Sequence, residues 1–208
     1  MDSARTRTWL RNAAFLLDQD KDRLTRLDSA IGDGDHGVNM HRGFSAVAAA
    51  LDEDDRADVT AGELLVAVGN TLVSTIGGAS GPLFGSSFRA LGKTLDGPSP
   101  QGERQRLAAA SDSVHRLGAA EPGDKTMYDV YRPAAAAFAR VTESGGDLPA
   151  AAHAATDVAE EGLRATEPMQ ARRGRASYLG LRSVGHQDPG AASLALIFQA
   201  LATALETK

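Results

Sequence analysis

Apolar residues recur every three or four positions along most of the chain, the spacing of an amphipathic helix. In the first such segment Trp9, Ala13 and Leu17 fall on one stripe. Stretches that contain Gly or Pro, which break helices, separate the periodic segments. The pattern predicts seven or eight helices, over Arg5–Leu17, Gly37–Leu51, Thr60–Ile76, Gly81–Leu95, Glu103–Leu117, Thr126–Thr142, Leu148–Ala165 and Ala191–Leu205.

The composition indicates an all-α protein. The chain has 38 Ala and 22 Leu, which favour helices, but only 11 Val and 3 Ile, which favour strands. A length of 208 residues, 42% of them hydrophobic, suffices for one core, and we see no repeat or low-complexity linker. We therefore expect residues 1–208 to form a single domain.

Charge and cysteine content exclude several classes of function. The formal net charge of −5 argues against a nucleic-acid-binding protein, which would carry a basic face. Cysteine is absent, which excludes disulfides and thiolate chemistry. No apolar run approaches the roughly 20 residues that span a bilayer. We expect a cytoplasmic protein that does not bind membranes.

The stretch 28–39 holds three carboxylates, Asp28, Asp33 and Asp35, among glycines that let the backbone turn back on itself. Such a loop can bring hard oxygen ligands onto Mg²⁺ or Ca²⁺. An Asp-Gly turn that caps the next helix is the structural alternative. The order of residues is not that of an EF-hand.

Two further turns precede predicted helices. Gly77-Gly-Ala-Ser-Gly-Pro82 would present free backbone N–H groups and a positive helix end to a phosphate, or it is a simple interhelical turn. In Glu121-Pro-Gly-Asp-Lys-Thr-Met127, Met127 could pack on a purine, or the turn only caps the next helix.

The segment 167–189 is long, rich in Gly and Arg, and without helical periodicity. Its arginines form either a solvated face or part of a phosphate clamp. We expect the segment to be partly mobile before ligand binds, because it offers few apolar anchors.

Four stretches together resemble the nucleotide-binding L subunit of bacterial dihydroxyacetone kinases of the phosphotransferase-system-dependent type. They are Ile31-Gly-Asp-Gly-Asp-His-Gly37, Gly77-Gly-Ala-Ser-Gly-Pro-Leu-Phe-Gly85, Glu121-Pro-Gly-Asp-Lys-Thr-Met127 and Gly174-Arg-Ala-Ser-Tyr-Leu-Gly180 with Gly185-His-Gln-Asp-Pro-Gly190. They occur in the family's order and span nearly the whole chain.

The resemblance implies a barrel of eight antiparallel helices with a nucleotide site at one end. It implies that Asp28, Asp33 and Asp35 bind two Mg²⁺ ions, and that Arg175 stabilises charge without any covalent catalysis in this chain. The remaining contacts to ADP or ATP would come from His36, Gly37, Val38, Asn39, Ala79, Ser80, Gly118, Met127, Asp188, Pro189 and Gly190.

The same resemblance implies two partners: a K subunit that holds dihydroxyacetone and receives the γ-phosphate, and a phosphotransferase-system protein that recharges bound ADP. Two alternatives stay open. The chain could belong to a two-chain kinase that exchanges free ATP and acts on another ketose such as erythrulose. It could also be a nucleotide-dependent regulatory module. Under any of these functions the chain could form a homodimer.

Overall fold

The computed structural model describes residues 1–56, 58–95 and 104–206, and its regular elements are all helical. The expected all-α class is confirmed over these residues. In chain order the helices are α1 (Ser3–Gln19), α2 (Lys21–Ile31), α3 (His36–Glu53), α4 (Ala61–Thr75), α5 (Ser80–Leu95), α6 (Arg104–Gly118), α7 (Tyr128–Glu143), α8 (Leu148–Ala165), the 3₁₀ helix η1 (Arg175–Ser183) and α9 (Pro189–Glu206).

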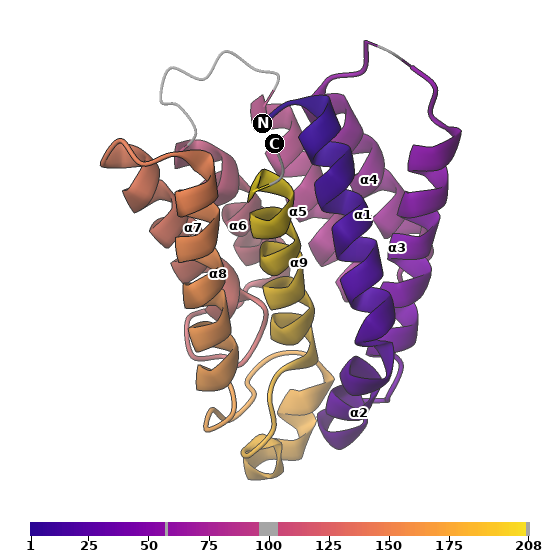
Figure 1. Ribbon diagram of the computed structural model, residues 1–208. Helices are drawn as coiled ribbons and strands as arrows, with labels where there is room; N and C mark the ends of the chain where they lie inside the picture. Colours follow the sequence, from indigo (N-terminus) through magenta and orange to yellow (C-terminus); the bar gives the residue numbers. More distant parts are fainter. Residues whose placement is uncertain (57, 96–103, 207–208) are drawn as a thin grey trace.

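Eight of these helices form a closed ring, because each packs against its neighbour in the order α1, α3, α4, α5, α6, α7, α8, α9 and back to α1. The helices run alternately up and down, and both termini lie at the same end of the bundle (Figure 1). At the opposite end, α2 packs against α3, α9 and η1. The expected antiparallel barrel is therefore confirmed, with two short helices added at that end.

Two helices, α2 and η1, were not predicted from the sequence. The pattern failed at α2 because that helix is mostly polar and buries only Leu24, Asp28 and Ile31. Asp28 consequently lies in the last turn of a helix, not in a loop. The 3₁₀ helix η1 buries only Ser183, so it too leaves no apolar period. The start predicted for the helix that corresponds to α6, Glu103, lies outside the described residues.

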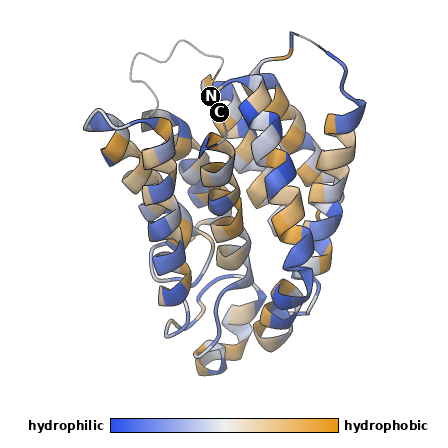
Figure 2. Cartoon of the chain, viewed as in Figure 1, coloured by the Kyte–Doolittle hydropathy of each residue, from blue (hydrophilic) through white to orange (hydrophobic). Residues whose placement is uncertain are grey.

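The core is one continuous cluster that draws on all eight barrel helices. Figure 2 shows hydrophobic and hydrophilic residues alternating along the helices, as expected for helices with one buried face. Helix α9 is long and apolar enough to cross a membrane by length and composition, but 72% of that stretch is buried in the bundle. A core helix has this character.

Glycines bring α4 and α5 unusually close together. A Cβ atom added at Gly85 of α5 would lie 2.6 Å from the carbonyl oxygen of Gly69 on α4, and one at Gly92 would lie 2.5 Å from that of Gly62. Small residues on both surfaces allow the two backbones to approach. This contact fixes where the turn between α4 and α5 lies.

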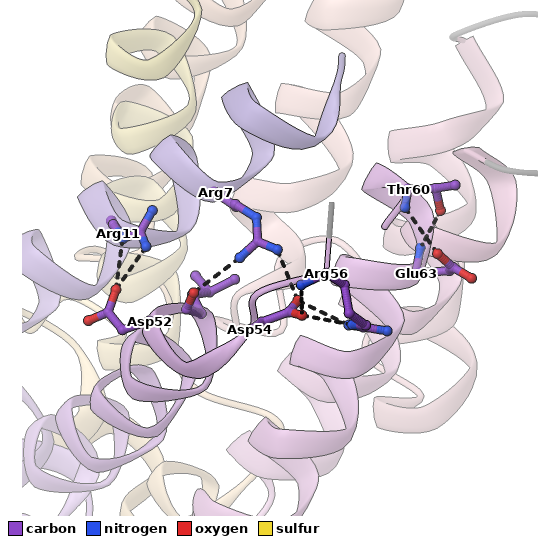
Figure 3. A network of polar contacts seen from close by, with 8 residues as sticks. Arg7, Arg11, Asp52, Asp54, Arg56, Thr60 and Glu63 are labelled. Atoms are coloured by element: carbon purple, nitrogen blue, oxygen red, sulfur yellow. Dashed lines mark hydrogen bonds and ion pairs between the residues drawn. The ribbon is translucent and has the colours of Figure 1, made fainter. Parts of the chain in front are cut away.

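An ion-pair network at the end that holds the termini ties the connection between α3 and α4 to α1 (Figure 3). Arg7 donates to the carbonyl of Leu51 at 3.1 Å and to Asp54 at 2.9 Å. Hydrogen bonds from Arg56, and a further one from Arg7, hold the pKa of Asp54 well below its usual range. Arg11 pairs with Asp52 on the same face. The network stabilises the end of the barrel at which the two termini lie.

We expect Gly85→Ala to destabilise the protein by about 1–3 kcal/mol, the usual cost of overpacking. In an open helix the same change would stabilise by roughly 0.5–1 kcal/mol, so the sign reports the close contact with Gly69. Urea unfolding monitored by circular dichroism measures the difference. The neighbouring Ser86→Ala is the control and should change the free energy of unfolding by less than about 0.5 kcal/mol; equal stability of the two variants would contradict the close packing.

Candidate functional site

A cavity of about 530 Å³ opens at the end of the barrel that carries α2 and η1. Small-molecule sites typically measure roughly 300–1,000 Å³. The N-terminal ends of α3, α5, α7 and α9 all border it, through His36, Ser80, Met127 directly before α7, and Pro189. Because alternate helices start at the same end of an up-and-down barrel, their N–H groups and positive dipole ends converge there. The cavity is therefore built to attract negative charge.

Three carboxylates lie on one side of this cavity. Oxygen atoms of Asp28, Asp33 and Asp35 lie within 4.8 Å of one another. Asp28 is buried, and its Oδ2 accepts hydrogen bonds from the backbone N–H groups of Asp35 and His36, at 2.9 and 3.1 Å. The carboxylate of α2 thus holds the start of α3 in place.

The backbone of this turn has room for nothing larger than glycine at two positions. A Cβ atom at Gly32 would collide with the Asp28 carboxylate. Gly34 has a φ of 74°, which side chains other than glycine rarely adopt. Three hard oxygen donors held this closely suit Mg²⁺ or Ca²⁺. The donor set fits the metal site that the sequence predicts.

His36 connects three helices at the floor of the cavity. Its Nε2 lies 2.8 Å from the hydroxyl of Ser193 on α9, and its Nδ1 lies 3.3 Å from the hydroxyl of Ser80 on α5. Burial lowers the pKa of His36, although Asp28 and Asp35 oppose this shift. A neutral imidazole has one donor and one acceptor nitrogen, which its two serine partners can both satisfy.

The wall opposite the carboxylates is mostly apolar. Leu83 of α5, Val114 and Leu117 of α6, and Met127 before α7 line it together with Gly118. Gly118 faces Leu83, whose Cδ2 would lie 3.3 Å from an added Cβ atom. A flat apolar group can pack against such a wall.

The segment 167–188 closes one side of the cavity. Arg173 and Arg175 line it, and Arg175 pairs with Asp33 at 3.1 Å. Arg173 donates to Asp124 at 3.2 Å. Asp188 caps α9 by accepting from the N–H of Ala191 at 2.7 Å. Burial raises the pKa of Asp188 to about 7, against the opposing effects of the Ala191 hydrogen bond and Lys125.

Most of the residues predicted from the sequence meet in this cavity. Its lining includes Asp28, Asp33, Asp35, His36, Ala79, Ser80, Gly118, Met127, Arg175, Asp188, Pro189 and Gly190. Three predicted residues do not line it: Gly37, Val38 and Asn39. Gly37 lies where α3 packs on α2, Val38 is exposed, and the amide of Asn39 accepts from Arg42 and faces Gly77.

Three lining residues with polar side chains were not named as nucleotide contacts from the sequence: Lys125, Thr126 and Arg173. Two of them belong to the turn 121–127 and the third to the Arg-rich segment, so both motifs pointed to the correct region. What the sequence did not reveal is that these two segments contact each other.

Comparison with known proteins points to one family. The DAK2 domain family matches residues 30–203. The ADP-binding subunit DhaL of the PEP-dependent dihydroxyacetone kinase of Escherichia coli K12 is 46% identical over 94% of both chains. These matches confirm the resemblance inferred from the four sequence motifs.

Two further similarities involve longer proteins. The L-erythrulose 1-kinase of Mycolicibacterium smegmatis is 39% identical over 86% of this chain, which covers 31% of that enzyme. The crystal structure of the dihydroxyacetone kinase of C. freundii superposes with a TM-score of 0.75 at 25% identity, over 98% of this chain and 35% of that one. The barrel is thus a unit that also occurs inside larger kinases.

The raised pKa of Asp188 gives stability a defined pH dependence. Its carboxyl has a pKa of about 7 in the folded protein against an ordinary value of 3.8, so the folded state binds the proton more tightly over that interval. The contribution of Asp188 to stability is therefore present at low pH and is lost as pH rises toward 7.

We expect Asp188→Asn, which keeps a good helix cap, to become more stable relative to wild type as pH rises through this interval. Urea unfolding in EDTA at several pH values measures the difference. A constant difference between the two proteins across that pH range would show that Asp188 is not protonated in the fold.

Proposed function

Because the chain belongs to the DAK2 domain family, we propose that it is the nucleotide-binding subunit of a dihydroxyacetone kinase. One observation carries this proposal: three clustered carboxylates share a cavity with the N-terminal ends of four helices. Magnesium nucleotides need this combination, with oxygen ligands for the metal and N–H donors for the phosphates. The similarity to an ADP-binding subunit supports it.

Each wall of the cavity has a role in this proposal. Asp28, Asp33 and Asp35 would hold two Mg²⁺ ions, which neutralise phosphate charge when bound. Ser80 and the N–H groups of the turn 77–80 would bind phosphate oxygens, with His36 orienting the Ser80 hydroxyl. The other predicted contacts that line the cavity would be to adenine, at Gly118 and Met127, and at the junction of the closing segment with α9, at Asp188, Pro189 and Gly190.

Phosphoryl transfer requires mainly positioning and charge stabilisation from the protein. Arg175 is placed to stabilise charge on the transferred group, because its guanidinium already lies at the carboxylate side of the cavity. The dihydroxyacetone would be held by a separate K subunit, which docks at the open end of the site. We infer that ADP then stays bound and is recharged by a phosphotransferase-system donor protein in the cytoplasm, with residues 1–208 acting as one domain.

Another ketose is the second candidate substrate, supported by the similarity to an erythrulose kinase. In that case free ATP would exchange at the site and the partner subunit alone would choose the sugar. A regulatory module that binds a partner according to nucleotide state is the third candidate. It would bind nucleotide in this cavity without turnover.

We expect Asp33→Asn to weaken binding of Mg-ADP by at least about 100-fold, because loss of even an outer-shell partner of a metal costs 10–100-fold. Isothermal titration calorimetry measures the affinity, and EDTA should abolish binding to the wild type. Asp22→Asn, an exposed change near the start of α2, is the matched control and should bind normally. Wild-type affinity in Asp33→Asn would contradict the metal assignment.

The nucleotide content of the purified protein separates the candidates. We expect protein purified without added nucleotide to release stoichiometric ADP on denaturation, and labelled ATP not to displace that ADP beforehand. Ready exchange with ATP would indicate the ATP-dependent kinase. Nucleotide binding without phosphoryl transfer to dihydroxyacetone or erythrulose, with K subunit and phosphoryl donor both present, would favour the regulatory module.

A further inference from the structure

The side chain of Lys125 is almost completely buried, with 1% of the residue exposed. Its Nζ donates to three backbone carbonyls, those of Ser183 at 2.7 Å, Met169 at 3.0 Å and Glu167 at 3.4 Å. An ammonium has three protons and accepts nothing. All of its hydrogen-bonding capacity is therefore spent on the segment 167–188, although Lys125 also lines the cavity.

These three carbonyls lie on both arms of the segment, where the first arm is residues 167–174 before η1 and the second arm is residues 183–188 at its end. Glu167 and Met169 precede η1, and Ser183 is its last residue. The N–H of Gly185 donates to the carbonyl of Glu167 at 2.8 Å, which closes the segment into a loop at the point where the ammonium lies. Lys125 thus joins the two arms at their base.

Apolar packing contributes little to this loop. Tyr178 and Leu181 on η1 are 88% and 77% exposed, and Ala171 is the buried apolar residue of the first arm. A segment with few buried apolar contacts opens easily. Polar contacts to the turn 121–127 therefore have to hold the loop in place. The Lys125 ammonium makes three of these hydrogen bonds.

The same turn fixes the arginines of the loop. The backbone N–H of Arg172 donates to the carbonyl of Asp124 at 3.0 Å, and the Arg173 guanidinium donates to the Asp124 carboxylate. Lys125 itself has a φ of 61°, an uncommon conformation for a residue other than glycine. In this conformation, the side chains of Asp124 and Lys125 both contact the loop.

We propose that Lys125 is a positioning residue: granting the nucleotide site proposed above, its ammonium shapes the loop 167–188 so that Arg173 and Arg175 face the bound phosphates. Lys125 does not itself bind the nucleotide. Its loss lowers affinity by reducing the fraction of molecules whose loop is folded, since the apparent dissociation constant rises in inverse proportion to that fraction.

Lys125→Met keeps the length of the side chain and removes its donors. We expect it to bind Mg-ADP about tenfold more weakly, as when one molecule in ten has the loop in place. Amide hydrogen exchange within 167–188 should become faster in the nucleotide-free protein, while exchange in α4 and α5 stays unchanged. Lys125→Gln, which retains two donors, should fall between the two proteins and serves if the Met variant does not fold. Lys93→Met, an exposed change on α5, is the control.

Hydrogen exchange in the nucleotide-free protein separates positioning from direct binding, because a lysine that only contacted nucleotide would leave the free loop unchanged. In the double variant Lys125→Met/Arg175→Ala the two losses should multiply, since Arg175 sets the affinity of molecules with a folded loop and Lys125 sets their fraction. Wild-type affinity in Lys125→Met or unchanged hydrogen exchange in the loop would each overturn the inference. Failure of the wild type to bind Mg-ADP would instead count against the proposed function, and the exchange comparison would still test the hold of Lys125 on the loop.

Discussion

The alternation of helix direction around the closed ring is the constraint on which the site depends. In such a ring every second helix starts at the same end, so α3, α5, α7 and α9 direct their free N–H groups into one cavity. Four positive helix ends lower the cost of placing Asp28, Asp33 and Asp35 side by side. Asp28 shows this directly, because its carboxylate accepts from the first N–H groups of α3.

Close packing of small residues keeps those four helix ends within reach of one another. The glycine contacts between α4 and α5 set the position of the turn 77–80, and Gly77 comes to lie against the Asn39 amide of α3. A further link runs through His36, which joins α3 to Ser80 and to Ser193. The chain is poor in aromatic side chains, and its small residues permit this geometry.

The helices with an apolar stripe could be predicted from the sequence, and the elements held by polar contacts could not. Helix α2 and the loop 167–188, which Lys125 contacts, have few buried apolar residues, so no apolar periodicity predicts them. The chemistry of the site was recognisable from residue types, but not its exact members. Consecutive residues on a helix point about 100° apart. Gly37, Val38 and Asn39 therefore cannot all face the cavity that His36 lines.

The cavity holds groups of both charges. Asp28, Asp33 and Asp35 lie together on one side, where Arg175 pairs with Asp33, while Arg173, the buried Lys125 ammonium and the ends of α5, α7 and α9 supply further positive charge. A free metal ion would be repelled by the positively charged groups, and a free nucleotide would be repelled by the carboxylates. A metal–nucleotide complex presents the metal to the carboxylates and the phosphates to the positive groups, so each component raises the affinity for the other. This division favours the complex over either component alone, which is what a phosphoryl-transferring subunit must hold.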